Sequence, residues 1–191
     1  MVATTLANPA GLRFKKYTHE FSAFQNTGPV FDVDYFKAKP ADFEGSATSP
    51  RIGNPGWPYG GYDITLGGRT FDAQFAALLF HGFYVARFTG SHVFSSSGDF
   101  IDNWGYFWTG DLAYSTYDDS NTAFRAVRVD GEPYAGGQTT LQMNAGDAVP
   151  ITWLWSNGGG AGNSDFTIST PGGIGGGAGD FIPACSASTF A

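Results

Sequence analysis

The residues most suited to chemistry in this chain are oxygen-bearing side chains beside two aromatic segments. Asp102 and Asn103 come directly before the segment Trp104–Thr109, and Asn157 opens a glycine-rich stretch, residues 158–162. Carboxylates, side-chain amides and backbone carbonyls are the oxygen donors that Ca²⁺ takes, about six to eight at a time. We therefore expect the two loops to meet at one end of a β-sheet and to hold Ca²⁺, on which sugar hydroxyls can also bind.

Composition limits the classes of protein to which the chain can belong. Its 191 residues suit one domain, and hydrophobic residues at 42% supply a packed core despite 28 glycines. Only 14% of the residues are charged, the formal net charge is −7, and no basic run is present, which argues against a nucleic-acid partner. We expect a single domain over residues 1–191 that is monomeric when isolated.

The chain lacks the sequence features of membrane insertion. The longest fully apolar run, Phe75–Phe80, is far too short to span a membrane. No basic and then apolar leader follows Met1, so we expect a mature domain to which Met1 was added. Few Lys and Glu, with many Gly, Ser, Thr and Phe, are typical of extracellular or cell-wall proteins. Cys185 is the only cysteine, so the chain cannot form an internal disulfide.

Short apolar and aromatic runs separated by Gly, Asn, Asp and Pro predict an all-β protein, an antiparallel β-sandwich with long ligand-side loops. In the run 82–88 apolar residues alternate in a way that fits a sheet with one buried face. Thr89–Ser91 is expected to form a tight turn between two strands. The expected strands are Leu12–Tyr17, Gly82–Phe88, His92–Ser96, Trp104–Thr109, Phe124–Val129, Thr139–Met143, Pro150–Trp155 and Asp165–Ser169.

Two longer stretches are expected to be irregular. Phe43–Gly68 is rich in proline and glycine, and Trp57 and Tyr59 lie near its centre. These two rings either stack on the apolar face of a sugar or fasten the loop to the sheet, and the sequence leaves both roles open. Gly110–Ser120 is a second polar and aromatic stretch, in which a short helix is expected to end before Asn121.

Other motifs are better explained by structure than by chemistry. Gly173–Ala178 matches a dinucleotide-binding pattern, but Pro183 follows where that pattern requires a helix, so we expect a turn. Asp118 and Asp119 form a second possible metal pair, for which a solvated turn is the favoured interpretation. The histidines are spaced too widely for a zinc pattern and are expected in structural roles: His19, His81 and His92.

No pair of carboxylates stands out as a catalytic pair. Glycoside hydrolysis requires two facing carboxyl groups, one of them protonated. Asp102 has Asp99, Asp118 and Glu132 as conceivable partners, but no spacing selects one of them. Cys185 has no neighbouring base to activate it as a nucleophile. We therefore expect a protein that is not an enzyme, with a hydrolase or an accessory domain of one as a minor alternative.

Residues 101–114 (IDNWGYFWTGDLAY) resemble the GLEYA domain of fungal surface proteins. That domain is related to the flocculin lectin domains of yeast and to the β-sandwich of anthrax protective antigen. The resemblance continues through residues 150–162 and ends at the Pro-Ala-Cys segment, 183–185. It covers about residues 80 to 185, with a weaker echo at residues 11–17.

The resemblance implies specific ligands. In such lectins two acidic residues joined by a cis peptide bind Ca²⁺ and sugar hydroxyls together, and this pair corresponds to Asp102 and Asn103. A later Asn corresponds to Asn157, and the backbone carbonyls that complete the cage correspond to Gly159 and Ala161. The implied function is a calcium-dependent carbohydrate-binding domain of a fungal cell-surface adhesin, with extracellular or cell-surface glycans as partners.

The chain departs from the family pattern at one ligand. Asn103 replaces a carboxylate and leaves Asp102 as the only formal charge of the set, so calcium binding should be weaker than in an Asp-Asp site. The glycines after Asn157 offer no side chains to a sugar. The alternative is therefore an interaction or structural module that has lost calcium and sugar binding. The cysteine that would pair with Cys185 in the family is absent from this chain.

Overall fold

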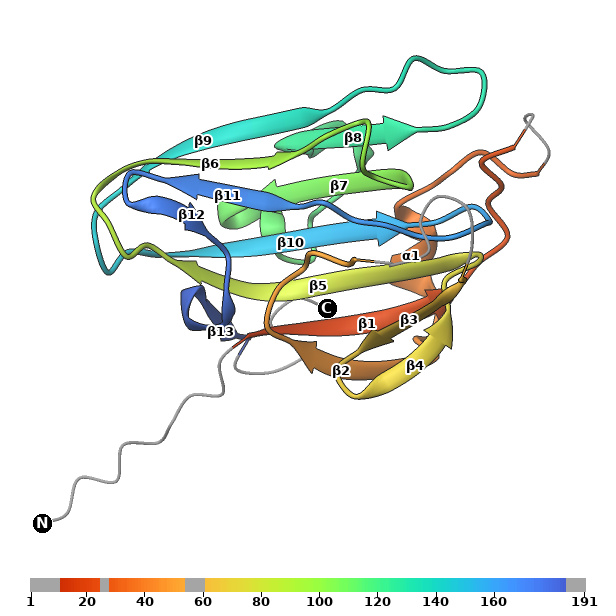
Figure 1. Cartoon of the computed structure of the whole chain (residues 1–191), viewed down its shortest axis with the longest axis horizontal. Coiled ribbons are helices and arrows are strands. Elements are labelled where there is room, and N and C mark those ends of the chain that lie inside the picture. Colours follow the sequence, from red (N-terminus) through yellow and green to blue (C-terminus); the bar gives the residue numbers. More distant parts are fainter. Residues whose placement is uncertain (1–10, 25–27, 54–60, 185–191) are drawn as a thin grey trace, which may run out of the picture.

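The computed structural model describes residues 11–24, 28–53 and 61–184. Its strands build a large sheet in the order β2-β1-β5-β10-β7-β8, with β13 also paired to β5, and a four-stranded sheet in the order β12-β11-β6-β9 (Figure 1). A separate hairpin joins β3 to β4, and every strand pair is antiparallel. The predicted all-β antiparallel sandwich is therefore confirmed.

The chain contains thirteen strands, one short α-helix and three 3₁₀ turns among the described residues. The strands are β1 (Leu12–Thr18), β2 (Phe43–Ala47), β3 (Asp63–Leu66), β4 (Arg69–Asp72), β5 (Ala76–Val85), β6 (Gly90–Ser96), β7 (Asn103–Thr109), β8 (Phe124–Arg128), β9 (Gly137–Met143), β10 (Ala148–Ser156), β11 (Thr167–Thr170), β12 (Gly173–Gly175) and β13 (Phe181–Pro183). The helices are α1 (Asp34–Ala38) and the 3₁₀ turns η1 (Gly110–Ala113), η2 (Asp119–Asn121) and η3 (Ala178–Asp180).

The large sheet is buried on both faces over most of its central strands. Between the two sheets, Phe80, Phe94, Trp153 and their neighbours form the main core. On the outer face a second cluster, which includes Tyr17 and Trp108, is covered by α1 and by the segment that carries η1 and η2. In residues 82–88 burial alternates as expected, because Tyr84 and Ala86 are buried in the core between the sheets whereas Val85 is half-buried and Arg87 is exposed.

Most predicted strands form, with shifted ends. The run 75–80, for which the sequence pattern predicts no strand, is largely the first half of β5, and its residues 76–80 are buried as in a central strand. The predicted turn between two strands is present slightly before Thr89–Ser91, because residues 86–89 connect β5 to β6, which begins at Gly90. This connection leads from the large sheet to the small one.

The two stretches expected to be irregular contain more regular structure than predicted. Phe43–Gly68 holds β2 and β3, although its residues 54–60 lie outside the described part. Gly110–Ser120 contains η1 and the start of η2, so the short helix predicted there is present as two 3₁₀ turns. No helix in the described ranges is long and apolar enough to cross a membrane.

Several loops gather at one end of the sandwich, drawn at the right of Figure 1. They are the segment before α1, the start of β7, the β8–β9 connection and the loop after β10. Strand β10 pairs with β7 so that Ser156 lies opposite Trp104. Because this register aligns the end of β10 with the beginning of β7, the two loops that carry the predicted ligands leave the sheet side by side.

Candidate functional site at the loop end of the sandwich

The two predicted loops are in direct contact. The Gly158 N–H donates to Asn103 Oδ1 over 2.6 Å, and the Asp102 N–H donates to the Asn163 carbonyl over 2.9 Å. Both contacts follow from the pairing of β7 with β10, whose ends lie next to each other in the sheet. The expectation that residues 102–103 and the glycine-rich loop meet at one end of the sheet is therefore confirmed.

A cavity of about 160 Å³ opens between these loops. Four chain segments form its walls, because the segment before α1 and the β8–β9 connection close over the two predicted loops. The lining residues are Ala23, Phe24, Asp102, Asn103, Arg128, Asp130, Tyr134, Gly159, Gly160 and Ala161. Four of the five predicted metal ligands thus line one small, mixed polar and aromatic cavity, and the fifth, Asn157, lies behind its wall.

Asn103 is buried, and its side-chain amide makes three hydrogen bonds. The Nδ2 group donates to Asp102 Oδ1 and to the Arg128 carbonyl, each over 2.9 Å. Its Oδ1 accepts the Gly158 N–H. The peptide bond between Asp102 and Asn103 is cis, as the resemblance implies. The nitrogen of Asn103, rather than its oxygen, therefore faces the carboxylate of Asp102.

Asn157 is fully buried and shapes the loop that follows it. Its Nδ2 group donates to the carbonyls of Ala73 and Gly160, both over 3.0 Å, and its Oδ1 accepts the Gly159 N–H over 3.1 Å. These bonds fold the loop over the side chain. Asn157 thus supports the cavity wall from behind, a role that the spacing of the sequence did not reveal.

The side chains present do not form the calcium cage that the resemblance implies. Both amide oxygens already accept backbone N–H groups, and the Asn103 Nδ2 group donates to Asp102 and to the Arg128 carbonyl. Asp102 and the carbonyls of Gly159 and Ala161 remain, and these carbonyls accept no hydrogen bond within the described part of the chain. The two carboxylate oxygens of Asp102 and these two carbonyls make at most four protein ligands, fewer than the roughly six to eight that Ca²⁺ takes.

Clusters of acidic, histidine and cysteine side chains do not supply a metal site elsewhere. Among the described residues, no group of three or more His, Cys, Asp or Glu side chains lies together in a way that would hold a metal ion. The amide oxygens of Asn103 and Asn157 both accept backbone N–H groups of the loop after β10, those of Gly158 and Gly159.

Two exposed aromatic rings flank the cavity, and no sequence motif identifies them. Phe24 is 47% exposed and Tyr134 is 52% exposed, although large apolar side chains are usually covered. The guanidinium of Arg128 lies 5.1 Å from the centre of the Tyr134 ring and holds it beside the cavity. The rings predicted for sugar stacking, Trp57 and Tyr59, lie outside the described residues.

The remaining predicted candidates lie elsewhere and act structurally. Asp118 caps η2 by accepting the Ser120 N–H over 2.7 Å, in agreement with the favoured turn interpretation. His19 bonds to Ser156 and His92 bonds to Tyr84, each over 2.8 Å.

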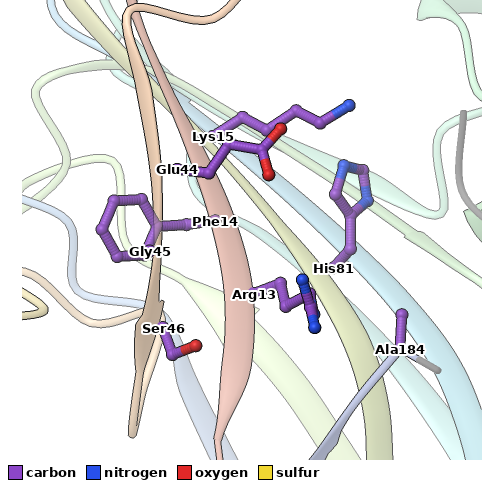
Figure 2. Close-up of a pocket in the computed structure, with 8 residues that line it drawn as sticks. All are labelled: Arg13, Phe14, Lys15, Glu44, Gly45, Ser46, His81 and Ala184. Carbon is purple, nitrogen blue, oxygen red and sulfur yellow. The ribbon is translucent and has the colours of Figure 1, made fainter. Parts of the chain in front are cut away.

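A second hollow of about 210 Å³ lies on the outer face of β1, β2 and β5. Figure 2 shows Arg13, Lys15 and His81 on this side of the sheet, while Phe14 points to the opposite side. His81 is buried, and its Nδ1 lies 3.1 Å from Thr152 Oγ1. The lining residues include no tyrosine or tryptophan and none of the predicted ligands, so the cavity beside Asp102 remains the better candidate.

Burial, together with the positive charge of nearby Lys15, lowers the pKa of His81 to about 3. Thr152 Oγ1 also donates to the Ala113 carbonyl over 2.5 Å. Since a carbonyl can only accept, the hydroxyl hydrogen is used there, and the Nδ1–H of a neutral His81 donates to the hydroxyl oxygen. His81 therefore links the sheet to η1 in its uncharged form.

Comparison with solved structures shows the same fold in sugar-binding proteins. The chain is similar to the A domain of epithelial adhesin 6 from Candida glabrata, solved in complex with Galb1-3GlcNAc, with a TM-score of 0.66 and 18% identity over 94% of this chain and 88% of that one. It is also similar to the A domain of epithelial adhesin 9 from the same organism, in complex with Galb1-4GlcNAc, with a TM-score of 0.65 and 11% identity over 91% and 88%.

A PA14 sugar-binding domain from an RTX adhesin gives a TM-score of 0.55 and 14% identity over 92% of this chain and 99% of that one. At these identities the structural likeness establishes the fold. The comparison with curated proteins yields no match. The family described as the GLEYA domain matches residues 76–170, about half of the chain, and this segment contains Asp102, Asn103 and the loop after β10. The chain therefore carries a GLEYA domain, as its resemblance to that family predicted.

Proposed function

We propose that the chain is a carbohydrate-binding domain of a cell-surface adhesin and that it binds sugar in the cavity beside Asp102. The observation that carries the proposal is the meeting of a carboxylate, loop carbonyls and two exposed aromatic rings in one small cavity. The GLEYA match and the sugar-bound relatives with the same fold support it. The proposed location is extracellular, at the cell surface or cell wall, and the proposed activity is binding rather than catalysis.

The recognition chemistry follows from the groups around the cavity. Asp102 and the carbonyls of Gly159 and Ala161 are acceptors suited to sugar hydroxyls. Phe24 and Tyr134 offer ring faces to the apolar side of the sugar. The volume of about 160 Å³ lies below the roughly 300–1,000 Å³ of pockets for drug-sized ligands, which suits one sugar residue.

Affinity for a single sugar should be weak. Few atoms are buried in so small a cavity, so a dissociation constant of about 1 mM is expected. Several copies displayed on one surface would raise the apparent affinity through multivalency. This mode suits adhesion, in which many weak contacts act together.

We also propose, from the resemblance to calcium-dependent lectins, that Ca²⁺ takes part in sugar binding. Bound Ca²⁺ would supply a charged centre that ligates vicinal sugar hydroxyls. Asp102 and the carbonyls of Gly159 and Ala161 are the groups nearest to such a role. The amides of Asn103 and Asn157 are engaged in internal hydrogen bonds. The contacts proposed between sugar and protein therefore need no metal ion.

An interaction module without sugar binding is the second candidate. The observation that favours it is the engagement of Asn103 and Asn157 in internal hydrogen bonds. In that case the loop end of the sandwich would keep its shape without a saccharide ligand.

A calorimetric titration against a panel of galactose-terminated and other glycans distinguishes the two candidates. The domain is titrated once in CaCl₂ and once in EDTA, and an Asp102→Ala variant serves as the negative control. We expect heat of binding for at least one glycan, absent in the variant. Heat only in CaCl₂ would support the calcium requirement, and no heat for any glycan in either buffer would reject sugar binding.

A further inference from the structure

Asn103 joins three separate parts of the loop end through one side chain. It lies at the start of β7, and its amide reaches Asp102 in its own turn, the Arg128 carbonyl at the end of β8, and the Gly158 N–H in the loop after β10. Asn103 is only 6% exposed, so water competes little for these hydrogen bonds. This residue is therefore the point at which the walls of the cavity are fastened together.

The orientation of the amide is fixed by its partners. Asp102 Oδ1 as a carboxylate and the Arg128 carbonyl can only accept, whereas the Gly158 N–H can only donate. The observed orientation points two N–H bonds at the two acceptors and the oxygen at the donor. A flipped amide would place acceptor against acceptors and donor against donor, which the hydrogen-bond network excludes.

A carboxylate at this position could not make the same connections. Aspartate has nearly the shape of asparagine but no hydrogen to donate, so it would face a second carboxylate and a carbonyl with like partial charges. Two such acceptors at close range require a positive charge between them, whether a proton or a metal ion. The –NH₂ group of Asn103 takes the place of such a charge, because its hydrogens carry partial positive charge.

We propose that the Asn103 amide is a built-in substitute for a cation, which assembles the loop end without metal, and that aspartate there would make assembly depend on Ca²⁺. The inference concerns the site of the proposed function but does not depend on a sugar binding there. The experiment therefore measures thermal stability. A failure of this inference can then be distinguished from a failure of glycan binding.

The experiment compares the wild-type domain with Asn103→Asp in EDTA and in excess CaCl₂. Replacing the amide donor by a second carboxylate, opposite the half-buried Asp102 carboxylate and the Arg128 carbonyl, should lower the melting temperature of the variant in EDTA by about 4 °C or more. Calcium should recover most of this loss, because Ca²⁺ takes carboxylate and carbonyl oxygens together. The wild type should melt within about 1 °C of the same temperature in EDTA and in calcium, apart from any weak stabilisation by ligand binding.

Two control variants separate this effect from a general effect of charge. Asn144→Asp also removes an amide donor to a carboxylate, that of Asp147, but lies in the exposed β9–β10 turn. Its melting temperature should respond to calcium no more than that of the wild type. Asn103→Ala removes the three hydrogen bonds without adding a carboxylate, so it should be destabilised and calcium should not restore it.

Three results would overturn the proposal. Equal melting temperatures of wild type and Asn103→Asp in EDTA would show that the amide does not stabilise the loop end. An equal calcium response in the two proteins would show that the amide does not take the place of a cation. Failure of Asn103→Asp to fold in either buffer would show that a cation cannot replace it.

Discussion

At the scale of single residues, the aromatic rings and the carboxylate beside the cavity have different roles. Asp102 offers charge and accepts hydrogen bonds, whereas Phe24 and Tyr134 offer exposed faces. Single substitutions should therefore show the separate contribution of each residue to glycan affinity.

Replacement of Tyr134 by alanine should weaken glycan binding about 3- to 10-fold without a large change in stability. Aromatic contacts contribute roughly 0.5–1.5 kcal/mol beyond their buried area, and the ring is half exposed in the free protein. Titration of the variant with the best glycan of the panel measures the change. Phe88→Ala is the matched control, because Phe88 is 43% exposed and lies after β5, at the other end of that strand from the site. An equal loss in both variants would contradict the role of Tyr134.

At the scale of elements, the loop after β10 depends on glycines at defined positions. Gly159 has a φ of +126°, which side chains rarely adopt, and a Cβ there would lie 2.9 Å from Phe24 Cε2. Gly160 has a φ of +79°, and nothing lies within 4 Å of the point that a Cβ would occupy. The two neighbours therefore differ mainly in whether a side chain would collide with the cavity wall.

Gly159→Ala should lower glycan affinity by about 10-fold or more, because it displaces both the loop and the Phe24 ring. Gly160→Ala is the control and should change affinity by less than about 3-fold, since only its backbone preference is affected. Titration of the two variants under identical conditions decides the matter. Similar affinities would mean that the loop rearranges without consequence for the ligand.

The pairing of β7 with β10 explains why these loops form one site. A shift of this register by one residue would turn the side chains of one strand to the other face. The buried Trp153 and Trp155 oppose such a shift, because both lie in the core between the sheets. The position of the cavity is thus set by the packing of the strands that lead into its loops.

At the scale of the whole molecule, the two buried histidines beside the outer face of the large sheet make stability depend on pH. Burial, together with neighbouring lysines, lowers the pKa of His81 to about 3 and that of His19 to about 4. In the unfolded chain each titrates near 6.5. Between about pH 6.5 and pH 4 the unfolded state therefore binds more protons than the folded state.

The sign of the effect follows directly, since protons then favour unfolding. The free energy of unfolding should decrease as the pH falls from about 6.5 to about 4, by up to roughly 1.4 kcal/mol per pH unit for each histidine. His81→Asn keeps a donor near Thr152 but cannot be protonated, so its melting temperature should fall less steeply over this range. Thermal melts of both proteins at intervals from neutral pH to about pH 4 test this. Parallel curves would show that His81 does not contribute.

Much of this architecture can be predicted from local sequence, but not the covering of the large sheet. Short apolar and aromatic runs between turn-forming clusters predict β1, β7 and β10 almost to their ends. The continuous apolar run of β5 signals a strand buried on both faces. It was missed because a short apolar run does not show what covers it. The elements β2 and β3 were missed because glycine- and proline-rich sequence also suits loops.

The identity of the site residues divides in the same way. Asp102, Asn103 and the glycine loop are local motifs, and the sequence alone placed them at one end of a sheet. Phe24 and Tyr134 carry no local signal, since they lie in ordinary loops far from Asp102 along the chain. Their place beside the cavity results from the packing of the segment before α1 and of the β8–β9 connection.

The sequence by itself determined the all-β class, the GLEYA resemblance and the oxygen-rich residues at two strand ends, because these depend on residue type and short-range spacing. Only the tertiary structure decided which atoms of those residues face one another. Asparagine and aspartate have almost the same shape, and which side of an amide meets a carboxylate depends on partners contributed by β8 and by the loop after β10. Those partners are brought together by strand pairing, which no short stretch of sequence encodes.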